Sequence, residues 1–137
     1  MKRLILMTCA ALGLLSGCAT FSVPDDTLVH EGQTIRTIFF SLKYPVGAPE
    51  ANKVLRYAQE NLTQIPGVED FQILKQTDEK SGCQYRMTLL FPSKPALELY
   101  KRHVLRQRVV AEIQKHQLFY YVYDFTPFDY SDAAPQK

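Results

Sequence analysis

Two hydrophobic repeats alternate along the middle of this chain, and their order limits the folds it can adopt. A repeat of two residues is typical of a half-buried strand, whereas a repeat of three and four residues is typical of an amphipathic helix. The two-residue repeat predicts strands over residues 34–42, 68–75, 85–91 and 118–125. The first of these segments has apolar residues on both faces, which is typical of a strand buried on two sides.

Helical patterns separate these strands. Pro49 suits the first turn of a helix, and apolar residues recur every four positions from Val54 to Leu62. Ser93 is a favourable N-cap with Pro95 in the turn that follows, so a short helix is predicted after it. A second helical segment covers residues 105–113, where apolar residues again recur every four positions.

The resulting order is strand, helix, strand, strand, helix, helix, strand, which is the split βαβ arrangement of a ferredoxin-like α+β fold. In such a βαββααβ protomer the helices cover one face of a single sheet. The other face also carries apolar residues, among them Phe39, Phe119 and Tyr121. Because a large apolar patch is unfavourable in water, we expect a second copy of the chain to cover this face in a homodimer.

The segment before Cys18 is typical of a signal peptide. Lys2 and Arg3 form its positive start, and the apolar run that follows is shorter than the roughly 20 residues needed to span a bilayer. The run ends in Leu15-Ser16-Gly17-Cys18, which resembles the lipobox of bacterial lipoproteins. The alternatives are a secretory signal without lipidation and a weak transmembrane anchor.

The lipoprotein resemblance implies a membrane anchor. In that family a signal peptidase cuts just before the cysteine, whose thiol carries a diacylglycerol with acyl chains such as palmitate. Ala19 is not the aspartate that favours retention in the inner membrane, so we expect an envelope protein anchored in the outer membrane through Cys18 and facing the periplasm. The expected divisions are a signal peptide over residues 1–17, a lipidated cysteine and flexible tether over residues 18–33, a domain over residues 34–127 and a tail over residues 128–137.

Charge and cysteine content narrow the possible functions. The chain has 16 basic and 14 acidic residues, and two of the basic residues precede Cys18, so the mature chain is formally neutral. A nucleic-acid-binding protein would need an excess of basic residues, so the neutral charge argues against this class.

After Cys18 only Cys83 remains, so no disulfide forms within one mature chain. We expect Cys83 to be a small buried side chain, with an intermolecular disulfide or a reactive thiol as the alternative.

The cysteine and histidine residues are dispersed and have no metal-ligand spacing, so neither a metal ion nor another cofactor is predicted. Gly-rich phosphate loops and paired catalytic carboxylates are also absent from the sequence. With these sites absent, the candidate site is a cavity within the domain itself.

Several short motifs follow one another in a characteristic order. They are Thr37-Ile38-Phe39-Phe40, Ile65-Pro66-Gly67-Val68, Leu90-Phe91 before Ser93, Tyr100 with His103, and Val122-Tyr123-Asp124-Phe125. Their order and spacing resemble the stress-responsive A/B barrel, or Dabb, domain, and the resemblance covers residues 34–127. It implies a ferredoxin-like protomer whose sheet pairs with that of a second protomer to form a dimeric barrel.

The resemblance also bears on catalysis. A catalytic relative, the plant olivetolic acid cyclase, closes an aromatic ring with a tyrosine and a histidine in a cavity between sheet and helices. Tyr100 matches that tyrosine and is the candidate catalytic residue, whereas Arg106 stands at the histidine position and Arg36 matches a histidine of the first strand. Because arginine stays protonated near neutral pH, it cannot act as the base. His103 matches a histidine that is not the base, and we expect it at the surface.

The same resemblance outlines a ligand-binding cavity, although most of its residues could equally be core. An apolar pocket with arginines and phenols suits a small amphipathic anion, such as a fatty acid or a phenolic carboxylate. We therefore expect a membrane-anchored module that binds such a ligand or an envelope partner without catalysis. The alternative is a small cofactor-free enzyme, cyclase- or isomerase-like, that acts on a hydrophobic substrate. The candidate lining residues are Arg36, Ile38, Phe40, Val54, Ala58, Tyr85, Met87, Leu89, Tyr100, Arg106, Tyr120 and Val122.

Overall fold

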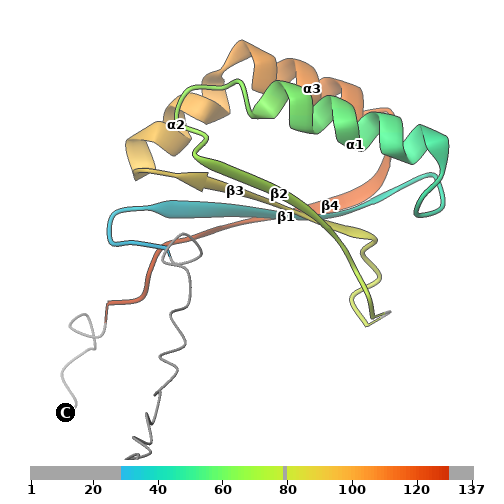
Figure 1. Cartoon of the computed structure of the whole chain (residues 1–137), viewed down its shortest axis with the longest axis horizontal. Helices are drawn as coiled ribbons and strands as arrows, with labels where there is room; N and C mark the ends of the chain where they lie inside the picture. The colour runs from blue at the N-terminus through green and yellow to red at the C-terminus, as the bar shows by residue number, and fades with distance from the viewer. Residues whose placement is uncertain (1–28, 79, 130–137) are drawn as a thin grey trace, which may run out of the picture.

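A four-stranded antiparallel sheet forms one layer of the structure, and the helices lie across one of its faces (Figure 1). This computed structural model describes residues 29–78 and 80–129. The elements in chain order are β1 (Thr34–Leu42), α1 (Pro49–Leu62), β2 (Asp70–Lys75), β3 (Tyr85–Phe91), α2 (Lys94–Arg102), α3 (Val104–Gln114) and β4 (Gln117–Phe125). The predicted ferredoxin-like α+β fold with its βαββααβ order is confirmed.

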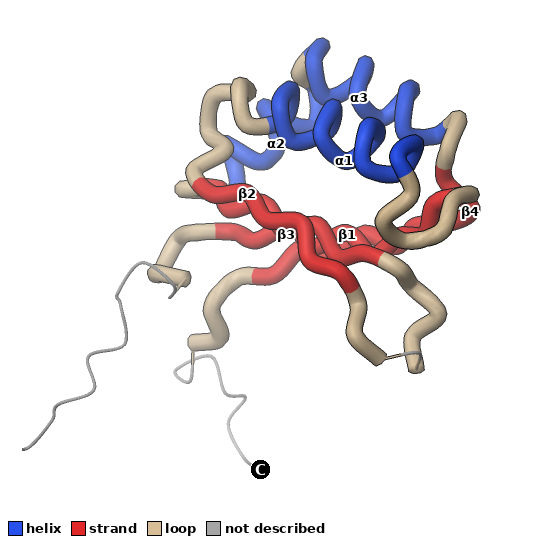
Figure 2. The backbone as a smooth tube through the Cα atoms, turned by 45° about the vertical axis from the view of Figure 1, so that its right-hand side comes forward, coloured by secondary structure: helices blue, strands red, loops and turns tan. Residues whose placement is uncertain are grey.

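The strand order in the sheet is β2-β3-β1-β4, so β1 lies inside the sheet and β4 forms one edge (Figure 2). Ile38 on β1 is paired with Met87 on β3 and with Val122 on β4. Alternate residues of a strand point to the same face of a sheet. These side chains therefore all face the helices, whereas Phe39 and its β4 partner Tyr121 face away from them.

The hydrophobic core lies between the sheet and the helices. Phe40, Leu89 and Phe91 project into it from the strands and are at most 3% exposed. Ala51 and Ala58 of α1 are fully buried, and their small side chains allow this helix to approach the sheet closely. The four-residue repeat that predicts α1 thus also identifies the side of α1 that packs on the sheet.

Two side chains cap the N-terminal ends of α2 and α3. The Ser93 hydroxyl accepts a hydrogen bond from the backbone N–H of Ala96 at 3.2 Å and caps α2, as predicted. His103 stands between the two helices, and its Nδ1 accepts a hydrogen bond from the backbone N–H of Leu105 at 3.2 Å. His103, which we expect at the surface, is partly exposed, and its ring caps α3.

Two strands begin at positions that differ from the predicted ones. β2 begins at Asp70 rather than at Val68, because the backbone N–H of Val68 is bonded to the carbonyl of Ile65 in the preceding turn. β4 begins one residue earlier than predicted, at Gln117, which pairs with Leu42 beyond a local irregularity in the register. Both differences lie at strand ends, where the geometry of the adjoining turn determines which residue pairs first.

Several predictions lie outside the described residues. They are the signal peptide over residues 1–17, the lipidation of Cys18, the first part of the tether, and the tail beyond Asp129. Within the described part of the chain, no helix is long and apolar enough to cross a membrane. Cys83, just before β3, is buried as expected.

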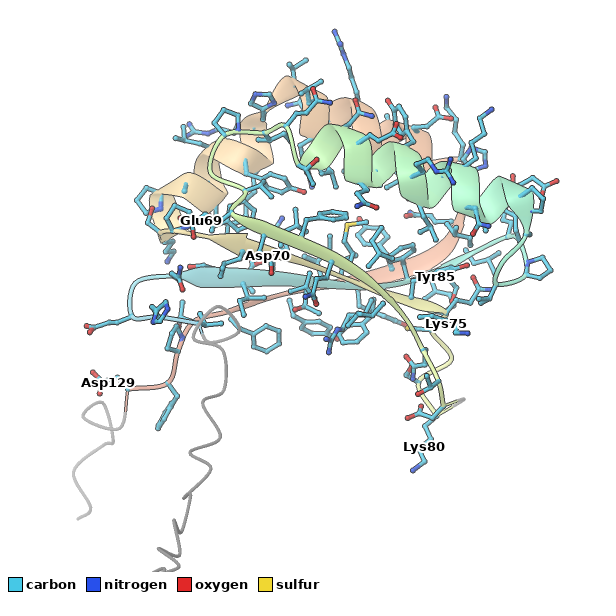
Figure 3. All side chains as sticks on the ribbon, viewed as in Figure 1. Glu69, Asp70, Lys75, Lys80, Tyr85 and Asp129 are labelled. Carbon is cyan, nitrogen blue, oxygen red and sulfur yellow. The ribbon has the colours of Figure 1, made fainter. Side chains whose placement is uncertain are left out.

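The sheet face opposite the helices carries uncovered side chains (Figure 3). Tyr121, Tyr123 and Phe125 of β4 are 54%, 49% and 51% exposed. Phe119 packs against Tyr121 and Phe39 packs edge-on against Tyr123, with ring centroids 5.8 Å and 6.2 Å apart. These five aromatic residues form what we call the outer aromatic face.

Candidate functional site

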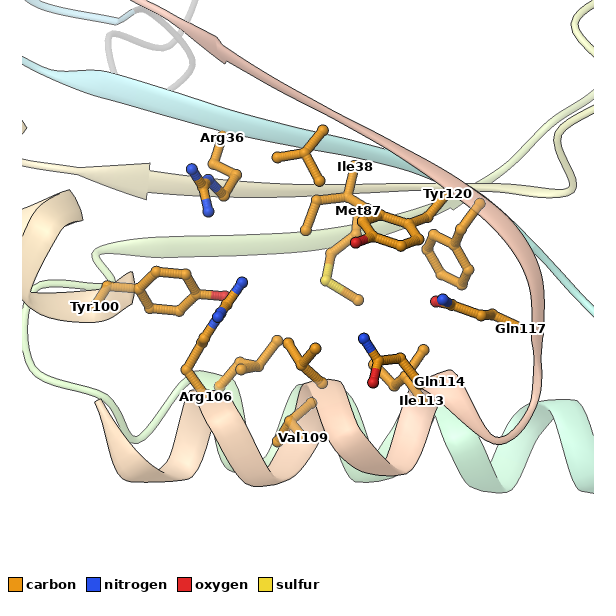
Figure 4. A pocket seen from close by; sticks show the side chains of 14 residues that line it. Arg36, Ile38, Met87, Tyr100, Arg106, Val109, Ile113, Gln114, Gln117 and Tyr120 are labelled. Carbon is orange, nitrogen blue, oxygen red and sulfur yellow. The ribbon is translucent and has the colours of Figure 1, made fainter. Parts of the chain in front are cut away.

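A cavity of about 80 Å³ lies between α3 and the part of the sheet formed by β1 and β4 (Figure 4). This volume is well below the roughly 300–1,000 Å³ of pockets that enclose drug-sized ligands, so the cavity admits only a small or slender molecule. Its β4 wall is partly open, because Tyr120 and Val122 are 48% and 39% exposed. The lining residues are Arg36, Ile38, Phe40, Leu62, Met87, Tyr100, Arg106, Val109, Val110, Ile113, Gln114, Gln117, Tyr120 and Val122.

The position of α3 explains why there is a cavity. α3 packs against α1 and α2, and it lies over β1 and β4 with the cavity between them (Figure 4). Arg106, Val109, Val110, Ile113 and Gln114 all line the cavity, and this spacing places them along one side of a helix. The cavity is therefore the space left between that side of α3 and the helix-facing residues of β1 and β4.

Arg36 and Asp124 form an ion pair at one end of this region, where they are direct partners in the β1–β4 register. Arg36 Nε and Nη2 donate hydrogen bonds to Asp124 Oδ1 and Oδ2, each at 2.8 Å. Such two-bond pairs are the strong form of an arginine–carboxylate contact. These bonds hold the pKa of Asp124 below its usual value although burial opposes this. Asp124 therefore stays charged and neutralises a guanidinium whose residue is only 7% exposed.

Tyr100 reaches the same end of the cavity from α2. It is 2% exposed, and its ring packs against that of Phe91 with centroids 4.9 Å apart. Burial raises the pKa of the Tyr100 hydroxyl, and the positive charges of Arg106 and Arg36 offset only part of this effect. The hydroxyl is therefore protonated near neutral pH, so it serves as a hydrogen-bond donor and not as a base.

Arg106 extends from α3 so that its guanidinium lies beside the Tyr100 hydroxyl (Figure 4). The residue is half-buried. Among the described residues, no carboxylate lies within ion-pair distance of Arg106, in contrast to Arg36 with its partner Asp124. A partly buried charge without a counter-charge is unfavourable, so this end of the cavity has the chemistry of an anion-binding site.

The sequence has a family match. Residues 35–130, well over half of the chain, match the stress responsive A/B barrel domain, Dabb. The chain belongs to the Dabb family. A search of curated proteins found no match to it.

Solved structures resemble this Dabb domain in fold. A Dabb family protein from Mesorhizobium loti has a TM-score of 0.69 at 23% identity, covering 72% of this chain and 100% of that one. The hydroxynitrile lyase of Passiflora edulis has a TM-score of 0.65 at 8% identity, covering 73% and 97%. A dimeric ferredoxin-like protein from Thermobifida fusca has a TM-score of 0.61 at 11% identity, covering 74% and 96%. At these identities the likeness is evidence for the fold alone.

The Dabb domain brings most of the predicted ligand-binding residues to the cavity. Val54, Ala58, Tyr85 and Leu89 are the exceptions, because they pack in the hydrophobic core and do not line the cavity. All four face inward as expected, but other side chains fill the space around them. The predicted residues that do line the cavity are Arg36, Ile38, Phe40, Met87, Tyr100, Arg106, Tyr120 and Val122.

The lining residues that sequence reasoning missed come from the two long helices and the start of β4. The repeat over residues 105–113 predicts a helix, but periodicity alone does not say whether core or cavity lies beneath a helix. No group of three or more His, Cys, Asp or Glu residues able to hold a metal ion occurs in the described part of the Dabb domain. The missed residues are Leu62, Val109, Val110, Ile113, Gln114 and Gln117.

Replacing Asp124 by asparagine should destabilise the Dabb domain by about 1–3 kcal/mol, because Arg36 is left buried without a counter-charge. The loss stays below that of a fully buried pair, since 34% of the Asp124 side chain is exposed. The pKa of Asp124 is lowered in the folded state. Its contribution is therefore complete above the usual aspartate pKa and disappears as the pH falls through the lowered value. Urea unfolding from neutral to acidic pH measures both effects.

Glu98→Gln is the matched control for this experiment. Glu98 also pairs with a cation, Lys101 at 2.7 Å, but this pair lies at the surface, and exposed pairs contribute little to stability. An Asp124→Asn domain as stable as wild type at neutral pH would show that the Arg36–Asp124 pair does not stabilise the fold.

Proposed function

We propose that this Dabb domain binds a small amphipathic anion in the cavity beneath α3, as a homodimer held in the cell envelope by a lipid on Cys18. The observation that carries the ligand proposal is the Arg106 guanidinium, which faces an apolar cavity without a carboxylate partner among the described residues. A ligand carboxylate or similar anion supplies the missing counter-charge.

The other groups at this end favour the same ligand. The Arg36 charge is already neutralised by Asp124, so Arg106 is the cation that remains for a ligand. The protonated Tyr100 hydroxyl beside it is a second hydrogen-bond donor. Ile38, Met87 and other apolar side chains line the rest of the cavity, and each ligand CH₂ group buried there contributes about 0.8 kcal/mol. An anionic head with a slender apolar body fits this arrangement.

Arg106→Ala should weaken the binding of a medium-chain carboxylate such as octanoate by about 1–3 kcal/mol, because a partly buried charged hydrogen-bond partner is lost. Titration calorimetry with the wild type and the variant measures this difference. Arg108→Ala is the matched control: Arg108 is on the same helix but exposed and outside the cavity, so it should have little effect. Equal binding of octanoate and its uncharged methyl ester by the wild type would contradict the arginine–carboxylate contact.

An enzyme that acts on a hydrophobic substrate in the same cavity is the second candidate. It is favoured by the position of Tyr100 and by the fold likeness to a hydroxynitrile lyase. Against it, no imidazole or carboxylate lines the cavity within the described residues, and the raised pKa of Tyr100 makes the hydroxyl a weak candidate for a base. We therefore favour binding. Conversion of a bound ligand that is lost in Tyr100→Phe would reverse this preference.

In our proposal the outer aromatic face is covered by the same face of a second protomer in the homodimer. Covering a few such side chains removes a few hundred Å² of apolar surface per protomer, roughly 5–10 kcal/mol before association costs. The Thermobifida fusca protein of the same fold is dimeric. This face lies on the opposite side of the sheet from the cavity, so a partner there leaves the helices free.

Tyr121→Asp should convert the dimer to a monomer, because it places a charge in the centre of this interface. Analytical ultracentrifugation of the chain from Ala19 onward at micromolar concentration measures the mass. Leu99→Asp is the control, since Leu99 is 63% exposed on α2, away from the outer aromatic face. A wild-type chain that sediments as a folded monomer would refute the dimer.

Anchoring through Cys18 rests on the Leu15-Ser16-Gly17-Cys18 motif. Cys18→Ser should abolish incorporation of radioactive palmitate and leave the precursor uncleaved, because the thiol is the acceptor of the lipid. Labelling in bacterial cells, followed by separation of the two membranes, reports both lipidation and location. Ala19→Gly is the control and should be labelled normally. Unchanged processing of the serine variant, with an acyl-free wild type in the soluble fraction, would rule out the anchor.

A further inference from the structure

Two side-chain amides mark the end of the cavity opposite Arg106. Gln114 ends α3 and Gln117 begins β4, and both side chains line the cavity (Figure 4). Neither side-chain amide is hydrogen-bonded to another described residue. Each amide can both donate and accept hydrogen bonds, so this end of the cavity offers polar contacts to a ligand.

We propose that the ligand of this cavity is a ditopic molecule: an anionic head at Arg106, a slender apolar middle, and a hydroxyl or carbonyl group at the far end that contacts Gln114 and Gln117. This inference rests on the proposed anion-binding function and names the ligand class more closely. It assigns the two glutamines a role in specificity, because their hydrogen bonds strengthen the binding of a ligand with a second polar group, which a simple fatty acid lacks.

The spacing of the two ends sets the length of the ligand. Arg106 and Gln114 are eight residues apart on α3, which is about 12 Å along a helix axis. On the opposite wall, Arg36 and Phe40 of β1 span about 13 Å. An extended chain advances roughly 1.2 Å per bond, and the side chains reach inward from both ends. A chain of about eight carbons, counting the carboxylate carbon and ending in a hydroxyl, therefore matches the cavity.

The middle of the cavity supports this division. Ile38 and Met87 line it from the sheet, and Val109 and Ile113 line it from α3. These four side chains offer no hydrogen bond, and the polar group near them on the sheet side is the hydroxyl of Tyr120 (Figure 4). A polar group on the central part of the ligand that does not reach this hydroxyl is disfavoured. The volume of about 80 Å³ also excludes a broad or branched body.

The test compares octanoate with ω-hydroxyoctanoate on the full-length protein in phosphatidylcholine nanodiscs. The double variant Gln114→Leu/Gln117→Leu should bind the hydroxy acid about 3- to 10-fold more weakly than wild type, the range expected for one to two lost hydrogen bonds. It should bind octanoate at least as tightly as wild type, because leucine adds apolar surface. Isothermal titration gives all four dissociation constants.

Two controls and one replacement variant make the result specific. Gln107→Leu changes an exposed glutamine of α3 outside the cavity and should leave both constants unchanged. ω-Hydroxybutyrate is too short to reach both ends, so its binding should not depend on the two glutamines. The single variant Gln114→Leu, at an exposed position, replaces the double variant if the latter does not fold, and should show part of the same effect.

The outcomes separate this inference from the proposed function. If octanoate binds wild type and depends on Arg106, but the two acids respond equally to the glutamine variants, the ditopic ligand is overturned and the anion site stands. If neither acid binds wild type, both proposals fall. A loss confined to the hydroxy acid supports the ditopic ligand.

Discussion

The pairing of β1 with β4 is the interaction on which the rest of this structure depends. β4 is an edge strand, so among the described strands only β1 holds it. The Arg36–Asp124 pair joins the two strands on the side that faces the helices. A slip of one residue would turn every β4 side chain to the other face of the sheet. The same register therefore places Tyr120 and Val122 on the cavity and Tyr121 on the outer aromatic face.

Two arginines at one end of the cavity have different electrostatic situations. Arg36 lies on a strand, and the register brings Asp124 directly opposite to it. Arg106 lies on α3, across the cavity from the sheet, and its neighbour there is the neutral Tyr100 hydroxyl. The first arginine is thus part of the structure, and the second keeps a charge that a ligand can use.

β4 belongs to two surfaces at once because successive side chains of a strand point to opposite faces. Its cavity side and its outer aromatic face are both partly exposed in the single chain. In the proposed dimer, a partner on the outer face would restrain the strand that also forms the open wall of the cavity.

The sequence by itself determined the order of the elements and the faces of the strands, because both depend on local periodicity. Thr34–Leu42 and Tyr85–Phe91 have the predicted bounds, and α1 begins at Pro49, the residue predicted for its first turn. Only the tertiary structure decided which inward-facing residues line the cavity. Val54 and Leu89 follow the same sequence pattern as the lining residues, but they lie in the core and do not line the cavity. It also decided the partner of Arg36 and the place of Gln114 and Gln117 on the cavity wall. These depend on strand register and on how α3 lies over the sheet, and neither is encoded in a local repeat.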